Sequence, residues 1–232
     1  MAAQLRRIRD KRGYLLPHHG LMAVSMPGML DAYDALYSAI AFEPHRLSRH
    51  DHEFVWLAIL ITMREVLGTH HIARFHDAGG TDAEMADVLA IASLAGGGHL
   101  YRFVDQHWQP HLPDLDPRAA YLEAFDRARG NSPAALAHLA GAAVHACPGN
   151  WQVLEWPIGA AYEAEADEAA LAAALALLMF PGRVPICVEA AGVWRRLILA
   201  DRVSASPGFR AWAEVTGQGG YDEAIGISPA EK

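Results

Sequence analysis

The sequence predicts an all-α fold built from two tandem helical repeats. Alanine and leucine dominate the composition, and the alternating runs of β-branched residues that are typical of strands are scarce. Residues that start and stop helices also recur along the whole chain. With 232 residues, of which 52% are hydrophobic and 20% charged, the chain can bury a globular core.

Helix boundaries in the first half follow from side chains that satisfy the open ends of helices. Ser48 begins an S-x-x-D pattern directly before an apolar run, which predicts a helix start. Gly79 and Gly80 predict a helix end, because glycine tolerates the left-handed conformation found there. Thr81 and Glu84 then have the spacing of a capping box, so a new helix begins at once.

In the second half, Asp116 and Ser132 each stand directly before a proline. A capping side chain followed by proline at the first helical position predicts a helix start at each site. Three prolines between positions 110 and 117 indicate a short connection. We therefore expect an N-terminal helical repeat over 1–112 and a degenerate C-terminal repeat with a tail over 113–232.

A constant shift of 86 positions relates the two halves. It brings Thr81 onto Asp167, both good helix caps that precede an alanine-rich run. It also brings Trp108 onto Trp194, and tryptophan recurs in register by chance less often than alanine. The shift predicts an internal duplication.

Charge and cysteine content exclude several classes of protein. The formal net charge of −8 disfavours nucleic-acid and anionic-membrane partners. The longest apolar stretches, 54–63 and 171–180, are shorter than the roughly 20 residues of a membrane-spanning helix. The basic N-terminal stretch is not followed by the apolar run of a secretory signal, so we expect a cytoplasmic location. Two cysteines, Cys147 and Cys187, provide neither a disulfide framework nor a four-thiolate metal site.

One segment carries a family motif. Residues 64–85 resemble the core of the carboxymuconolactone decarboxylase and alkyl hydroperoxidase D-like family, which reads C-x-x-C-x-x-x-H, then a glycine eight residues later, then T-x-x-E. His71 falls on the histidine, Gly79 on the glycine, and Thr81 on the threonine. Upstream, Glu53 resembles, with a one-residue slip, the glutamate that opens the preceding helix of the family.

The departures from the motif concern redox chemistry. Arg64 and Leu67 occupy the two cysteine positions, and Asn150 and Val153 occupy them in the second repeat. Thiol peroxidases of the family need a reactive thiolate with a resolving thiol beside it. Thiol peroxidase activity is therefore the least supported alternative.

The resemblance implies acid–base chemistry on a small carboxylated ring, without metal or organic cofactor, and a homo-oligomer. His71 would be the general acid or base, since its ordinary pKa lies near working pH. Arg64 would bind the substrate carboxylate with its planar fork. We expect Arg64 and His71 to lie on one face of the same helix, because positions seven apart on a helix share a face. Glu53 or Glu65 would orient the imidazole or act as its partner base.

Structural interpretations stand beside these roles. His71 could be a hydrogen-bonded core residue, and Glu53 could serve the first turn of its helix. Arg64 and Glu65 could pair with neighbouring surface charges. The protein would then be a family member without catalysis that acts in binding or assembly. The histidine clusters at 50–53 and 70–76 fit no familiar ligand spacing, so we expect no metal site.

Overall fold

The structure, a computed structural model, describes residues 1–43 and 46–218, and within these ranges the chain forms helices and no strand. The predicted all-α class is confirmed. Contacts divide the chain into two compact units, Met1–His45 and Arg46–Lys232. The predicted division at 112/113 concerns duplication rather than compactness, and it stays a prediction. Among the described helices, none is long and apolar enough to cross a membrane.

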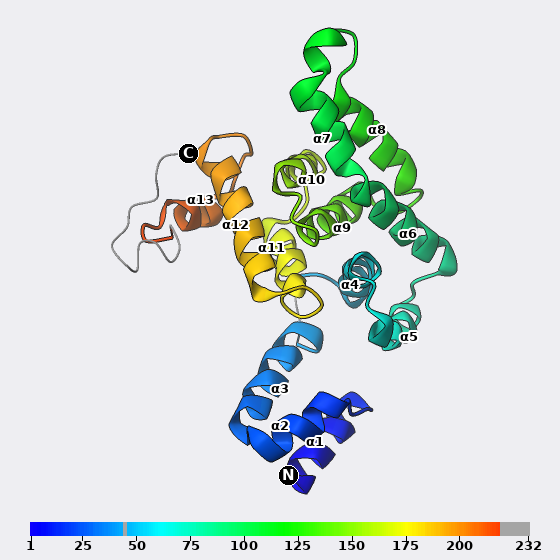
Figure 1. Cartoon of the computed structure of the whole chain (residues 1–232), viewed down its shortest axis with the longest axis vertical. Coiled ribbons are helices and arrows are strands. Elements are labelled where there is room, and N and C mark those ends of the chain that lie inside the picture. Colours follow the sequence, from blue (N-terminus) through cyan, green and yellow to red (C-terminus); the bar gives the residue numbers. More distant parts are fainter. Residues whose placement is uncertain (44–45, 219–232) are drawn as a thin grey trace. The chain divides into compact units, whose positions relative to one another are not determined.

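The first unit carries α1 (Ala2–Arg12), α2 (Pro17–Ser25) and α3 (Pro27–Ala41), drawn in blue in Figure 1. Gly13 ends α1 in the left-handed conformation, with φ of 83°. A small apolar core of Ile8, Met22, Ala23 and Leu30 holds the three helices together. Burial of this core favours the unit because apolar surface leaves water.

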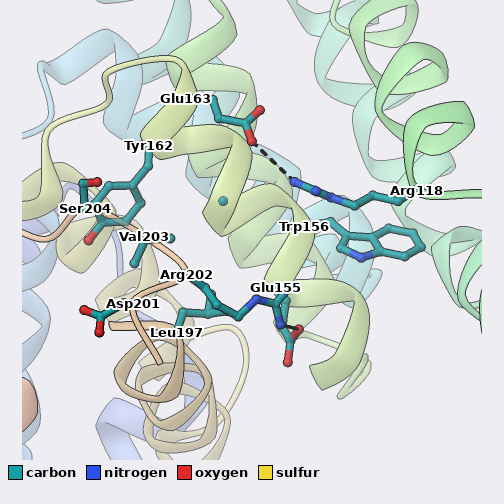
Figure 2. Close-up of a pocket in the computed structure, with 11 residues that line it drawn as sticks. Arg118, Glu155, Trp156, Tyr162, Glu163, Leu197, Asp201, Arg202, Val203 and Ser204 are labelled. Atoms are coloured by element: carbon teal, nitrogen blue, oxygen red, sulfur yellow. Dashed lines mark hydrogen bonds and ion pairs between the residues drawn. The ribbon is translucent and has the colours of Figure 1, made fainter. Parts of the chain in front are cut away.

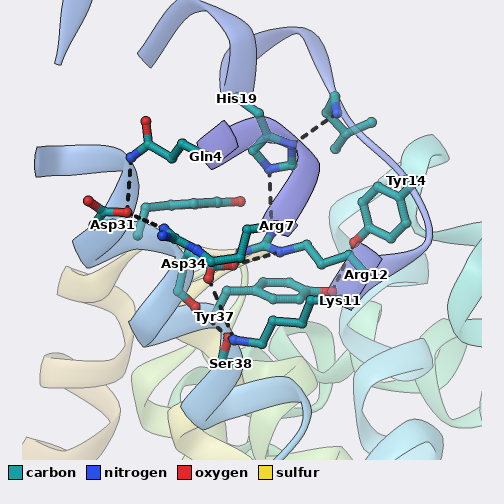
Figure 3. A network of polar contacts seen from close by, with 12 residues as sticks. Gln4, Arg7, Lys11, Arg12, Tyr14, His19, Asp31, Asp34, Tyr37 and Ser38 are labelled. Atoms are coloured by element: carbon teal, nitrogen blue, oxygen red, sulfur yellow. Dashed lines mark hydrogen bonds and ion pairs between the residues drawn. The ribbon is translucent and has the colours of Figure 1, made fainter. Parts of the chain in front are cut away.

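A polar network crosses the same unit (Figure 3). Nε and Nη2 of Arg12 donate to Oδ1 of Asp34 at 3.1 and 2.7 Å, and the Arg12 side chain is only 1% exposed. The guanidinium also lies 4.0 Å from the ring centroid of Tyr37, in cation–π contact. Asp34 therefore neutralises a cation that would be costly to bury alone.

The second unit contains ten α-helices within its described residues. They are α4 (Arg49–Met63), α5 (His70–Asp77), α6 (Asp82–Gly96), α7 (Gly98–His107), α8 (Pro117–Ala128), α9 (Ala134–Ala146), α10 (Trp151–Glu163), α11 (Glu168–Ala176), α12 (Val184–Leu199) and α13 (Pro207–Glu214). Short 3-10 turns occupy Val66–Thr69, Gln109–His111 and Leu177–Met179.

Helix α9 is the centre of the second unit and contacts α4, α6, α10, α11 and α12 (Figure 1). Its sequence, AALAHLAGAAVHA, is mostly alanine, and small side chains let neighbouring helices approach closely. Near its end, His145 is fully buried and bonds the hydroxyl of Tyr121 at 2.5 Å. Helix α9 therefore provides the surface on which α4, and with it the candidate site, is held.

The predicted helix starts are confirmed at three positions. The side chains of Ser48, Thr81 and Asp116 accept from backbone N–H groups at the starts of α4, α6 and α8. A helix also starts near Ser132, since α9 begins at Ala134, but the predicted cap is wrong: the N-cap is Pro133, which offers no capping side chain. Ser132 instead donates to Oδ2 of Asp87 at 2.8 Å, a partner 45 positions away.

The order of helices agrees with the predicted shift of 86 positions. Asp82 and Glu168 begin α6 and α11, and Gly98 and Val184 begin α7 and α12. The side chain of Asp167 caps α11 as that of Thr81 caps α6. These equivalent boundaries support the duplication, which stays a prediction.

Candidate active site

Helix α4 carries the carboxylate of the candidate site into the interior. Ser48 caps the helix, and every residue from His52 to Leu60 is buried. A helix that is buried around its whole circumference needs a partner for each polar side chain inside it. Glu53 is one such side chain, with 5% exposure.

Helix α5 provides that partner. His71, the second residue of α5, is 2% exposed, and its Nδ1 lies 2.6 Å from Oε2 of Glu53. The indole of Trp56, one turn after Glu53 on α4, stacks on the imidazole with centroids 4.5 Å apart and planes 23° apart. The imidazole is therefore oriented by a hydrogen bond at its edge and an aromatic ring on its face.

Electrostatics fix the charge state of this pair. Burial by itself would raise the pKa of Glu53, but contacts with His52 and His71 outweigh it and hold the pKa well below its usual range. Burial lowers the pKa of His71, and the attraction to Glu53 only partly opposes it. Glu53 is therefore a carboxylate that accepts, and His71 is a neutral imidazole that donates from Nδ1. The lone pair of His71 then lies on Nε2.

A second histidine completes the surroundings of the carboxylate. Nδ1 of His52 lies 3.6 Å from Oε1 of Glu53, and His52 is 5% exposed. Sequence reasoning assigned no role to His52. His52 takes the unslipped position of the family's glutamate and precedes Glu53 directly, but neighbours in sequence do not share a helix face. Burial of the whole start of α4 is what brings both histidines near one carboxylate.

The expectation that Arg64 and His71 share one helix is wrong. Helix α4 ends at Met63, and Arg64 adopts the left-handed conformation with φ of 55°. The Arg64 N–H donates to the carbonyl of Ile61 and that of Glu65 to the carbonyl of Leu60, the pair of bonds of a Schellman end. A 3-10 turn then leads into α5, so Arg64 and Glu65 lie in an exposed turn and not on the helix of His71.

An apolar cavity of about 290 Å³ lies beside this turn. Arg64 and Glu65 line it together with apolar side chains of three helices, which include Leu57 of α4, Ile72 of α5 and Met85 of α6. Ile72 follows His71 directly, but His71 does not line the cavity. The structure thus joins His71 with Glu53 and places Arg64 with Glu65 at a neighbouring apolar cavity.

The environments of the two cysteines disfavour the thiolate form. Burial raises the pKa of the Cys147 thiol to about 12, and burial also raises the pKa of the Cys187 thiol. Both side chains are therefore protonated at neutral pH. Within the described part of the chain, no group of three or more His, Cys, Asp or Glu side chains is arranged to hold a metal ion.

The fold and the site together define an all-helical protein with a buried histidine–carboxylate pair between α4 and α5. The model of the carboxymuconolactone decarboxylase family matches residues 27–104, about a third of the chain. The resemblance found in the sequence is thereby confirmed for a segment that runs from the start of α3 into α7 and includes Glu53 and His71. Comparison with curated proteins and with solved structures found no match.

Proposed function

We propose that the protein performs acid–base chemistry of the carboxymuconolactone decarboxylase type, a decarboxylation or an isomerisation, without metal or organic cofactor. The proposed substrate is a small carboxylated compound derived from an aromatic ring. The observation that carries the proposal is the 2.6 Å contact between Nδ1 of His71 and Oε2 of Glu53 inside the second unit. A buried carboxylate that fixes the tautomer of a neutral imidazole is an arrangement suited to a general base.

The chemistry follows from the charge state of the pair. Nε2 of His71 would take a proton from a carbon acidified by a neighbouring carbonyl, and Glu53 would stabilise the imidazolium that forms. Return of that proton to another carbon completes an isomerisation. When a carboxylate leaves as CO₂, the electron pair left behind takes up a proton, and the imidazolium would supply it.

Arg64 and Glu65 take the remaining roles in the proposal. Arg64 would bind the substrate carboxylate at the 290 Å³ cavity, whose other walls suit the apolar part of such a compound. Glu65, beside Arg64, would be a second acid or base. The proposal also includes a cytoplasmic homo-oligomer.

Turnover by single variants tests the proposed role of His71. We expect wild-type protein to release CO₂ from, or shift the ultraviolet absorbance of, carboxymuconolactone or a related carboxylated lactone. His71→Gln should lower kcat by about 10²–10⁴-fold, the usual contribution of a positioned acid or base. His76→Gln is the matched control, because His76 lies on the same helix and is half exposed. Full turnover in His71→Gln would refute the role.

A second candidate function is binding or assembly without catalysis. It is favoured by one observation: His71 is 2% exposed and does not line the neighbouring cavity. In that case the His71–Glu53 bond only fastens α5 to α4. His71→Gln would then lower the melting temperature, and no carboxylated lactone would be turned over by the wild type.

Thiol peroxidase activity is tested separately. Replacing Cys147 and Cys187 together by serine should leave every activity of the protein unchanged, because both thiols are held protonated. Loss of a peroxidase activity in the double variant would establish thiol chemistry instead.

A further inference from the structure

A larger cavity lies elsewhere in the second unit. Its volume is about 510 Å³, within the range of small-molecule sites. Figure 2 shows Glu155 and Glu163 of α10, Arg118 near the start of α8 and Arg202 of the turn after α12 around it. No residue of the His71 site lines it, so it does not depend on the function proposed above.

A glycine in the middle of α10, Gly159, lines this cavity. Gly159 lies inside the helix, where glycine is less favourable than alanine because it loses more backbone freedom. Packing does not require glycine there: a Cβ would meet only Nη2 of Arg118, at 3.8 Å, an ordinary contact. The absence of a side chain at Gly159 therefore enlarges the cavity, and no close packing contact requires it.

Two ion pairs border this space. Nη2 of Arg118 lies 3.4 Å from Oε1 of Glu163, and these side chains are 44% and 67% exposed. Nη1 of Arg202 lies 2.8 Å from Oε2 of Glu155. The Arg118–Glu163 pair is exposed, and exposed ion pairs contribute little to stability, so opening this one costs little. Within the described residues each guanidinium makes one such pair, which leaves most of its five N–H donors to a ligand.

The charges around the cavity balance. Asp201, the remaining acid, is already paired with Arg210 at 2.7 Å. A net anion would lie next to two carboxylates and a net cation next to two guanidinium groups. A zwitterion can instead insert between the two side chains of an ion pair. Its carboxylate then replaces the glutamate beside the arginine, and its ammonium replaces the arginine beside the glutamate. The Arg118–Glu163 pair is the one to open, because it is the longer of the two.

We propose that this cavity binds a small zwitterion of the amino-acid class. Its carboxylate pairs with Arg118, its ammonium pairs with Glu163, and its side chain lies over Gly159. The Arg202–Glu155 pair closes the other end of the space.

Binding to the full chain tests this assignment. The twenty L-amino acids are screened one at a time by the change in melting temperature, and the strongest is titrated by calorimetry. We expect at least one to bind. Its N-acetyl derivative lacks the ammonium and its amide lacks the carboxylate, so each should bind about tenfold more weakly or worse, as expected for loss of a charged partner.

Variants locate the binding. Three variants should each weaken binding of the amino acid by about tenfold or more: Arg118→Met and Glu163→Gln remove a charged partner, and Gly159→Leu fills the cavity. Arg127→Met is the matched control: Arg127 makes a similar exposed pair with Glu123 on α8, 2.6 Å long, and neither residue lines the cavity. Far-UV circular dichroism verifies that each variant is folded.

Three results would overturn the proposal. Binding of no amino acid excludes a zwitterion site of this class. Equal binding of the acetylated or amidated derivative shows that the paired charges are not what is recognised, as does binding of neutral sugars in place of amino acids. Unchanged affinity in Gly159→Leu places the ligand outside the cavity.

Discussion

At the scale of single residues, the carboxylate beside His71 determines what the imidazole can do. Glu53 is ionised and accepts from Nδ1, so the neutral ring presents its lone pair on Nε2. A histidine in the opposite tautomer could not be held by Glu53 and act as a base at the same time. In the function proposed above, Glu53 would therefore orient and polarise the ring rather than react itself.

This arrangement predicts the titration of His71. Because burial disfavours the imidazolium, His71 should stay neutral as pH falls through 6.5 and gain its proton only at lower pH. Glu53→Gln removes the attraction that opposes burial, so the pKa should fall further. Long-range ¹H–¹⁵N spectra measure both the tautomer and the titration. A proton on Nε2, or a midpoint at or above 6.5, would contradict this account.

The sequence predicted His71 and Glu53 through their motif positions, but it did not predict what surrounds them. Arg64 was expected on the His71 helix, yet a non-glycine residue with positive φ ends α4 there. No residue type marks that turn, since arginine adopts the left-handed conformation rarely. His52 was missed because its contact depends on burial of the whole helix start, which is a property of packing and not of spacing.

At the scale of helices, the same distinction holds between local signals and packing. Caps such as Ser48 and Thr81 were predicted because a side chain and a backbone group three residues apart suffice to form them. Ser132 has a similar local pattern, but Asp87 of α6 offers it a partner from another helix. Local chemistry alone therefore predicts which side chain caps a helix only where no distant group competes.

The junction of α6 and α7 gives a prediction at this scale. A Cβ on Gly98 would lie 2.4 Å from Cε1 of His145, a fully buried ring bonded to Tyr121. Gly98→Ala should therefore lower the free energy of unfolding by about 1–3 kcal/mol, the usual cost of overpacking. Gly96→Ala is the control, because a Cβ there meets nothing within 4 Å. Equal stability of the two variants, measured by urea unfolding, would contradict the close contact.

Two histidines of α9, His138 and His145, lead us to expect a loss of stability in acid. Burial lowers the pKa of His138 to about 4 and that of His145 to about 3, so both are neutral in the folded protein. In the unfolded chain each takes up a proton once pH falls below 6.5. Stability should therefore be full above 6.5 and fall below it, by up to about 1.4 kcal/mol per pH unit for each histidine.

Urea unfolding at about pH 7 and about pH 5 measures this loss. His138→Leu should flatten the dependence, because the proton that His138 takes up on unfolding is removed. His111→Gln is the control, since His111 is exposed in a 3-10 turn. An equally steep dependence in His138→Leu would assign the acid sensitivity to other groups.

At the scale of the whole molecule, the chain combines two units with different cores. The family match begins at the first residue of α3, which belongs to the first unit, and continues to α7 of the second. The segment that matches the family model therefore does not coincide with either compact unit. The second unit rests on a large apolar core around α9, whereas the first unit has a small apolar core and a buried ion pair.

The ion pair predicts how the first unit responds to mutation. Arg12→Met leaves Asp34, whose side chain is 10% exposed, without the guanidinium that neutralises it. Removing one partner of a buried pair costs about 3–5 kcal/mol, and Lys11, 3.5 Å from Asp34, offsets part of that cost. Amide hydrogen exchange should therefore speed up throughout α1–α3 while α9 keeps its protection, because the contacts of Arg12 lie within the first unit.

Two comparisons make this prediction specific to the buried charge. Arg9→Met, on the exposed face of the same helix, should leave exchange unchanged. Arg12→Met combined with Asp34→Leu should restore much of the protection, because replacing both partners leaves no unpaired charge inside. If the double variant exchanges as fast as Arg12→Met alone, the loss of stability comes from lost packing of the arginine against Tyr37 and not from the unpaired charge of Asp34.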